Sequence, residues 1–166
     1  LNVAFPVIVS DLDVGLSDIQ WLAGIYSLAF TGLLLPGGVM SDRLGPKRLL
    51  VVSLVLTAFA AGMSISAPSL GWLLVARAVQ GCGAALMTSS STSLLMSAYP
   101  ESERRAKAIG IWGGLSAMGL VLGPLLGGMV VEWLGWRWLF VVHLACCGLS
   151  LVFVAGTPVA RTLMQR

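Results

Sequence analysis

The sequence predicts an all-α protein, built as a polytopic membrane helix bundle. Of its 166 residues, 57% are hydrophobic and only 10% are charged, and the mean hydropathy is +0.93. A soluble domain carries about 25% charged residues, so a water-soluble domain is excluded. Apolar runs of about 20 residues, enough to cross a hydrocarbon core of about 30 Å, alternate with short charged segments. The net charge of +3 does not indicate nucleic-acid binding, because the basic residues are confined to a few loops.

Five complete helices and the end of a sixth are expected in chain order. The run Leu1–Val9 is too short to span a membrane and lacks the basic flank of a signal peptide, so it is interpreted as the tail of a first helix. Because the chain also stops soon after an apolar run, we expect a fragment of a longer protein. Ser17 and Gln20 fit a capping box at the next helix. The complete helices are predicted over residues 19–40, 49–67, 71–98, 108–131 and 138–156.

The distribution of charge predicts the orientation of the bundle. Eight of the ten Lys and Arg residues follow the second, fourth and sixth helices, whereas four of the seven acids follow the first and fifth. The positive-inside rule therefore places the turn at residues 41–48 in the cytoplasm. All loops are short, so no separate soluble domain is expected.

The first ordered motif is that charged turn. Asp42 ends a helix, where the helix dipole disfavours a carboxylate unless basic neighbours or another helix N-terminus compensate. Gly38 would let two helices approach closely, and Gly45 with Pro46 would force a tight turn. An ordinary positive-inside loop is the alternative, but the ordered spacing favours a functional role for this turn. The residues of the motif are Gly38, Asp42, Arg43, Gly45, Lys47 and Arg48, and the resemblance given below implies that they form a gate loop.

The second motif surrounds Arg77, which lies about 9 Å into its helix. An arginine at that depth should face protein or water and find a partner, unless it extends to the nearby interface. Gln80, Gly81 and Ala84 share its helix face, which favours the wall of a wet cavity. Thr88 and Ser91 would extend this polar face. Within the Ser/Thr run 88–93, hydrogen bonds to carbonyls one turn back remain an equal alternative.

The third motif is a glycine groove in the fifth helix. Gly119, Gly123 and Gly127 recur every fourth residue, a spacing typical of a groove for a neighbouring helix. Pro124 removes one N–H donor and leaves the Leu120 carbonyl unpaired, so the helix should bend there. The full motif runs over Gly119, Gly123, Pro124, Gly127 and Gly128.

With these three motifs the chain resembles the major facilitator superfamily, in particular its fourteen-helix drug:proton antiporters. Residues 103–112, 136–140 and 2–6 carry further similarity, so the resemblance covers nearly the whole chain. It implies that residues 1–166 are the N-terminal six-helix half of a two-half transporter in the plasma membrane, with the first helix truncated. The implied activity is proton-driven export of amphipathic small molecules, with no enzyme reaction, cofactor or metal. The implied partners are a small-molecule substrate, protons, the lipid bilayer and the missing C-terminal half.

The resemblance also implies roles for individual residues. Arg77, with Gln80 and Gly81, would belong to the proton-coupling and substrate region, and the acid that partners Arg77 would precede Leu1. Asp42, Arg43 and Arg48 would latch the cytoplasmic gate. Gly123, Pro124 and Gly127 would shape the bending of the fifth helix. A symporter or facilitator on the same fold, and a membrane remnant or sensor that does not transport, remain alternatives.

The remaining polar and aromatic candidates have more than one interpretation. His143 is the only histidine; a relay of protons is one role, and a hydrogen bond to a neighbouring carbonyl is favoured. Four aromatic residues offer flat surfaces to a ligand or serve as packing: Trp21, Tyr26, Phe30 and Trp112. The three cysteines lie in apolar runs without metal-site spacing and are interpreted as packing residues.

Overall fold

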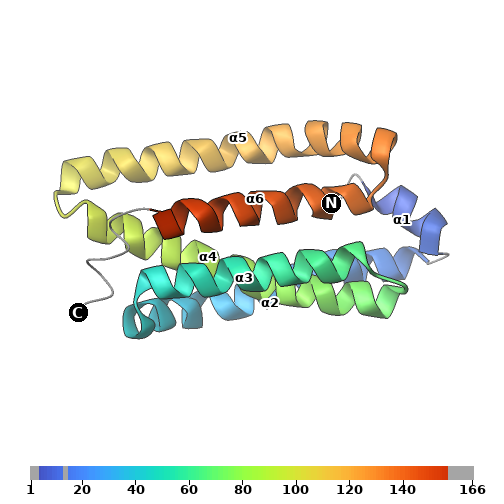
Figure 1. The fold of residues 1–166 in the computed structure, drawn as a ribbon, viewed down its shortest axis with the longest axis horizontal. Coiled ribbons are helices and arrows are strands. Elements are labelled where there is room, and N and C mark those ends of the chain that lie inside the picture. Colours follow the sequence, from blue (N-terminus) through green and yellow to red (C-terminus); the bar gives the residue numbers. More distant parts are fainter. Residues whose placement is uncertain (1–3, 13–14, 157–166) are drawn as a thin grey trace.

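The computed structural model describes residues 4–12 and 15–156, and its regular elements there are all helices. The long helices run back and forth along one axis (Figure 1). The prediction of an all-α bundle is therefore confirmed. Expectations for residues 1–3, Asp13 and residues 157–166 lie outside the described part of the chain. The helices are α1 (Phe5–Leu12), α2 (Leu16–Leu44), α3 (Pro46–Ile65), α4 (Leu70–Ala98), α5 (Ser102–Leu134) and α6 (Arg137–Gly156).

Several helices are longer than predicted, because charged residues at their ends are helical. α2 continues through Asp42 and Arg43 to Leu44, and α5 begins at Ser102. The expected charged turn is therefore reduced to Gly45, whose φ of 86° suits glycine, followed by Pro46 at the first position of α3. Gly135, with φ of 91°, makes the equally tight connection between α5 and α6. Charges near a helix end project into water or headgroups and need not end the helix.

The predicted cap of α2 is wrong by two residues. The helix begins at Leu16, with Gly15 as its N-cap, and Ser17 and Gln20 do not form the expected box. Instead, Asp18 lies three residues after the cap, and its Oδ2 accepts a hydrogen bond from the Gly15 N–H at 2.9 Å. A carboxylate in this first turn also interacts favourably with the positive end of the helix dipole.

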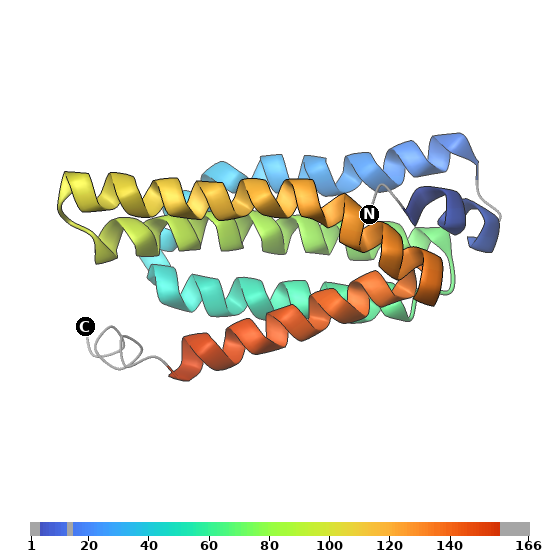
Figure 2. The same cartoon turned by 90° about the horizontal axis from the view of Figure 1, so that it is seen from above.

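α4 is the central helix of the bundle. It packs against α2 on one side and α3 on the other, and α6 packs on α3 (Figure 2). α5 stands apart, touching mainly α6, and Val131 is its one buried residue in the described chain. The orange C-terminal part of α5 bends toward α6 in Figure 2, and the presence of Pro124 within the helix predicts such a bend.

The buried core lies at the end of the bundle that carries α1. Ile8, Leu22, Leu73, Trp136 and Phe140 are each at most 3% exposed there. Helix α1, the start of α2 and the connections α3–α4 and α5–α6 all meet at this end (Figure 1). At the opposite end, where α2, α4 and α6 finish, Leu49 at the start of α3 is buried.

Polar bonds tie the same end together. The Asp11 carboxylate accepts hydrogen bonds from Trp136 Nε1 at 3.0 Å and from Arg137 Nη1 at 2.8 Å. The Arg137 guanidinium also lies 4.3 Å from the centre of the Trp136 ring, and its Nη2 donates to the Ala67 carbonyl at 3.4 Å. These bonds join α1, the α3–α4 connection and the α5–α6 turn, and we call them the Asp11 tie. The two donors hold the pKa of Asp11 below its ordinary value.

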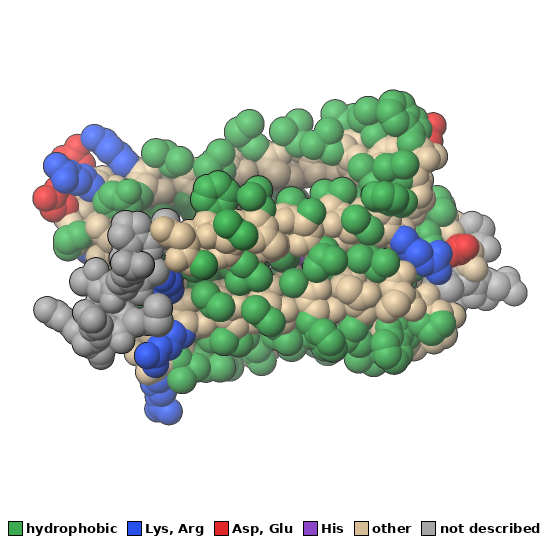
Figure 3. Space-filling model, in the orientation of Figure 1, with side chains coloured by type: hydrophobic (Ala, Val, Ile, Leu, Met, Phe, Trp, Pro, Cys, Tyr) green, Lys and Arg blue, Asp and Glu red, His purple; other side chains and the backbone are tan. Residues whose placement is uncertain are grey.

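The outer surface is that of a membrane protein. Hydrophobic side chains cover the flanks of the helices, and the charged groups lie toward the two ends (Figure 3). Five helices in the described residues, α2 to α6, are long and apolar enough to span a membrane. Large apolar side chains such as Leu28, Leu35 and Phe153 are between 65% and 83% exposed, a cost that lipid would remove.

Candidate functional site

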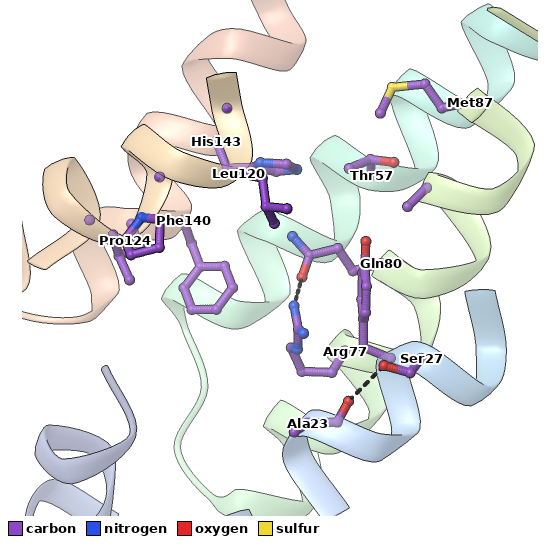
Figure 4. A pocket seen from close by; sticks show the side chains of 16 residues that line it. Ala23, Ser27, Thr57, Arg77, Gln80, Met87, Leu120, Pro124, Phe140 and His143 are labelled. Carbon is purple, nitrogen blue, oxygen red and sulfur yellow. Dashed lines mark hydrogen bonds between the residues drawn. The ribbon is translucent and has the colours of Figure 1, made fainter. Parts of the chain in front are cut away.

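A cavity of about 710 Å³ lies within the bundle, between α5 and the other long helices. All five long helices contribute to its wall, and Figure 4 shows their side chains from close by. Its volume lies within the range of about 300–1,000 Å³ that is typical of small-molecule sites. The lining residues are Ala23, Tyr26, Ser27, Thr57, Arg77, Gln80, Ala84, Met87, Gly119, Leu120, Gly123, Pro124, Gly127, Leu139, Phe140 and His143.

Arg77 points into this cavity rather than toward the near end of α4. Its Nη1 donates to Gln80 Oε1 at 2.7 Å, and its guanidinium carbon lies 4.3 Å from the centre of the Tyr26 ring. Gln80 is one turn deeper along α4, so the arginine reaches away from the nearby helix end. An arginine extending to the interface would lie in the opposite direction. The Arg77 Nε is buried without a hydrogen-bond partner among the described residues.

Only part of the predicted polar face of α4 lines the cavity. Arg77, Gln80 and Ala84 do so, and the face continues with Met87. Gly81 does not: a Cβ there would overlap the Tyr26 carbonyl oxygen and come within 3.1 Å of Ala29 Cβ, so this glycine permits α4 to pack on α2. Gly81 thus has a packing role in the structure, and its predicted place in the substrate region stays a prediction.

Four of the six hydroxyls in the Ser/Thr run of α4 donate hydrogen bonds within the bundle. Thr88 and Thr92 donate to the carbonyls of Ala84 and Thr88, and Ser90 donates to that of Leu86, at 2.7–2.9 Å. Ser89 donates to the Leu34 carbonyl of α2 at 3.0 Å. Neither Thr88 nor Ser91 lines the cavity. Of the two interpretations left open, back-bonding describes Thr88, Ser90 and Thr92.

His143 enters the cavity from α6. Its Nε2 is buried and has no hydrogen-bond partner in the described residues, so the favoured bond to a carbonyl is not seen at this atom. Among the aromatic candidates, Tyr26 lines the cavity and stacks on Phe30 with ring centres 6.3 Å apart. Trp21 and Trp112 are 65% and 40% exposed and lie outside its wall.

The residues of the predicted gate lie together at the α2–α3 connection. Asp42, Arg43 and Arg48 are exposed, and no ion pair joins Asp42 to a basic group in the described chain. Lys47 Nζ is buried without a hydrogen-bond partner there. A Cβ on Gly38 would meet no atom within 4 Å, so the expected close approach at this glycine is wrong. The neighbouring Gly37 makes one instead, because a Cβ there would come within 2.9 Å of Ser89 Oγ.

The glycine groove of α5 faces the cavity. Gly119, Gly123 and Gly127 all line it together with Pro124, and Gly128 is half-buried beside them. A Cβ on Gly119 or Gly123 would meet no atom within 4 Å, whereas one on Gly127 would lie 3.6 Å from Leu139. Among the described helices, the expected packing of another helix into this groove is therefore absent at Gly119 and Gly123, and α6 approaches it only at Gly127.

Several lining residues were not singled out from the sequence. Phe140 shares a face of α6 with His143, three residues away, and Leu120 lies beside the first glycine of the groove. Both could have been found from the sequence by their helical spacing from a residue already singled out, His143 for Phe140 and Gly119 for Leu120. Thr57 offered no such signal, because its neighbours in α3 are uniformly apolar or small.

Comparison with known proteins gives one family and a consistent set of relatives. The family model described as Major Facilitator Superfamily matches residues 1–163. The puromycin resistance protein of Streptomyces alboniger is 36% identical over 152 residues, covering 92% of this chain and 30% of the relative. A multidrug resistance protein, Stp, of Mycobacterium tuberculosis is 39% identical over 147 residues, covering 87% and 27%. The methylenomycin A resistance protein of Bacillus subtilis is 33% identical over 152 residues, covering 92% and 33%.

The chain thus spans about a third or less of these relatives' length. The matches confirm the resemblance to the major facilitator superfamily, and with it a transporter family rather than an enzyme. The chain belongs to the Major Facilitator Superfamily, a family of multi-pass membrane proteins.

Proposed function

We propose that the complete protein exports amphipathic small molecules in exchange for protons, and that residues 1–166 form the N-terminal half of this transporter. The relatives named for resistance to puromycin, to methylenomycin A and to multiple drugs support export of such compounds. The cavity supports it too, since its volume suits a drug-sized molecule and its wall mixes aromatic, apolar and polar side chains.

The observation that carries the proposal is the position of Arg77. A guanidinium within the lipid-thick part of a bundle costs a few kcal/mol or more, so such residues mark pathways for substrates or ions. Arg77 lines the cavity, contacts Tyr26 and Gln80, and has no carboxylate partner among the described residues. The resemblance places an acid before Leu1, and protonation of that acid would weaken its attraction to Arg77. Proton binding would then shift the balance of inward- and outward-facing states.

Two further motifs would convert this shift into alternating access. By the positive-inside rule the α2–α3 connection faces the cytoplasm, where Asp42 with Arg43 and Arg48 would latch the closed gate. The exposed Asp42 carboxylate would find its partner in the other half of the protein. Pro124, between Gly123 and Gly127, would allow α5 to flex beside the cavity.

The experiment is proton-driven efflux by the full-length protein in proteoliposomes with an imposed pH gradient. Arg77→Ala should abolish gradient-driven efflux, because the coupling charge is lost. Arg104→Gln is a matched control, since Arg104 is exposed and pairs only with Glu101 at the start of α5. The control should transport like the wild type.

Undiminished coupling in Arg77→Ala would refute the role of this arginine. Wild-type efflux that continues unchanged after the gradient is collapsed would instead identify a facilitator. No efflux of any substrate by correctly folded wild-type protein would favour a non-transporting membrane module.

A further inference from the structure

We propose that the cavity selects amphipathic carboxylates, and that the ligand carboxylate is held jointly by Arg77, Gln80 and His143. The inference rests on the proposed export function and names the substrate class of the same site. It follows from which hydrogen-bonding groups of the wall are already satisfied and which are not.

The Arg77–Gln80 bond fixes which atoms remain available. A guanidinium can only donate, so Gln80 must present its Oε1 to Arg77 at 2.7 Å. The amide NH₂ of Gln80 therefore points away from Arg77 as a donor, with no partner in the described residues. Arg77 Nε–H is a second donor, buried and unpaired. Arg77 and Gln80, one turn apart on α4, thus offer donors to the cavity, and the Gln80 Oε1 acceptor already receives the bond from Arg77.

His143 adds a third polar group from the opposite wall. In Figure 4 its ring points into the space that Gln80 also faces, with Leu120 beside it. Its Nε2 is buried without a partner in the described residues, and an unpaired buried nitrogen is unfavourable. In the tautomer that carries a proton on Nε2, a ligand oxygen would accept its hydrogen bond and remove this cost. Because α6 and α4 reach the cavity from different sides, a carboxylate between them has donors for both oxygens.

Two other hydroxyls of the wall already donate hydrogen bonds within the protein. The Ser27 and Thr57 hydroxyls donate to carbonyls of their own helices, Ala23 at 3.3 Å and Ser53 at 2.7 Å. No Asp or Glu is among the lining residues. Among the described residues the wall therefore carries one fixed positive charge, surplus donors and no negative charge. This favours an anion over an amine when the acid that the proposed antiport places beside Arg77 is protonated.

The rest of the wall suits the apolar body of such a ligand. Tyr26 and Phe140 provide ring surfaces, and Met87 and Leu120 provide flexible apolar contacts. A carboxylate on an aromatic or aliphatic frame would thus satisfy both parts of the cavity. A carboxylate at this position could also come from the protein itself, as an acidic side chain outside the described residues. The test below separates a ligand carboxylate from a protein carboxylate.

The test is calorimetric binding to the full-length protein in phosphatidylcholine nanodiscs, without a proton gradient. The probes are 2-naphthoate, the neutral 2-naphthalenemethanol and the cationic 2-naphthylmethylamine. Wild type should bind naphthoate at least about tenfold more tightly than either other probe, since charge-assisted hydrogen bonds are the strong ones. Arg77→Gln should remove this preference, whereas Arg77→Lys, which keeps the charge, should retain part of it.

A second variant isolates the histidine. His143→Leu should weaken naphthoate binding about three- to tenfold, the value of one lost hydrogen bond, and leave naphthalenemethanol within about twofold. Cys146→Ala is the matched control on α6, because Cys146 is exposed and outside the wall. It should bind all three probes like the wild type.

The proposal would be overturned if the wild type bound the amine or the alcohol as tightly as naphthoate. A preference for the amine would indicate that the carboxylate beside Arg77 belongs to the protein itself. A naphthoate preference that survives Arg77→Gln would also overturn it. Binding is measured without a proton gradient, so it is independent of the efflux assay. If the protein selects carboxylates but its efflux does not depend on protons, only the proposed antiport is contradicted.

Discussion

Helices α4 and α5 both contain closely spaced glycines, but these glycines face different surroundings in the two helices. In α4, neighbouring atoms occupy the space beside Gly81 and Gly83. A Cβ on Gly81 would overlap the Tyr26 carbonyl, and one on Gly83 would overlap Thr57 Oγ1. In α5, Gly119 and Gly123 face open space beside the cavity. One helix is clamped between α2 and α3, and the other is held mainly through its C-terminal connection.

The difference shows that glycine spacing alone does not reveal what a glycine faces. A missing side chain permits close packing in α4, where it lowers the distance between backbones. In α5 it enlarges a cavity beside a helix that contains Pro124. A rigid wall that holds Arg77 and a loosely held wall that faces it are what a gated cavity needs.

The largest expected effect comes from filling the two kinds of glycine. Gly81→Ala should destabilise the protein by about 1–3 kcal/mol, because main-chain atoms of α2 must move to admit the methyl group. Gly123→Ala should change stability by less than about 0.5 kcal/mol, since it meets no atom and alanine favours a helix. Thermal unfolding of both full-length variants in the same detergent measures the difference.

Equal destabilisation by the two substitutions would break the comparison. It would mean that a segment beyond the described residues fills the α5 groove as tightly as α2 fills the face of α4. No loss of stability in Gly81→Ala would contradict the close approach of α4 and α2.

A smaller effect is expected at the Asp11 tie, which anchors the end of α5 through the turn to α6. Asp11→Asn keeps an acceptor for Trp136 but loses the charge that attracts Arg137, 2.8 Å away. Both side chains are nearly half-exposed, so the loss of stability should be about 0.5–1 kcal/mol, measured by thermal unfolding at neutral pH. Glu103→Gln, which breaks an exposed pair with Lys107 within α5, should cost less.

The pH dependence of this tie has a definite sign. Hydrogen bonds from Trp136 and Arg137 lower the pKa of Asp11 in the folded state. The tie therefore stabilises fully above the ordinary carboxyl range near pH 4, and its contribution is lost as pH falls through the lowered pKa. The difference between wild type and Asp11→Asn should shrink on acidification below that range, and a difference that grows would contradict the assignment.

The course of the chain through the bundle could be predicted from apolar runs, because lipid demands long uninterrupted helices. The helix ends could not. Asp42 and Arg43 read as a loop, yet a charge at the last turn is solvated and the helix continues to Leu44. The cap at Gly15 was missed because the accepting carboxylate of Asp18 lies three residues further on.

The cavity could be predicted in part. The spacing of Arg77, Gln80 and Ala84 places them on one face whatever surrounds the helix, and that face lines the cavity. Whether Gly81 or Ser91 joins them depends on where α2 lies, which the local sequence does not specify. The unpaired Nε2 of His143 likewise depends on the separation of α5 and α6 rather than on any motif.

The most direct test of a hydrated cavity beside Arg77 is thiol labelling on two faces of α4. In a full-length protein lacking its natural cysteines, Ala84→Cys lies on the cavity face and Val75→Cys on the outer face, where Val75 is 54% exposed. A charged methanethiosulfonate reagent should modify the first at least about tenfold faster in one vesicle orientation, because thiolate forms in water and not in lipid. Equal, slow labelling at both positions in both orientations would contradict the account.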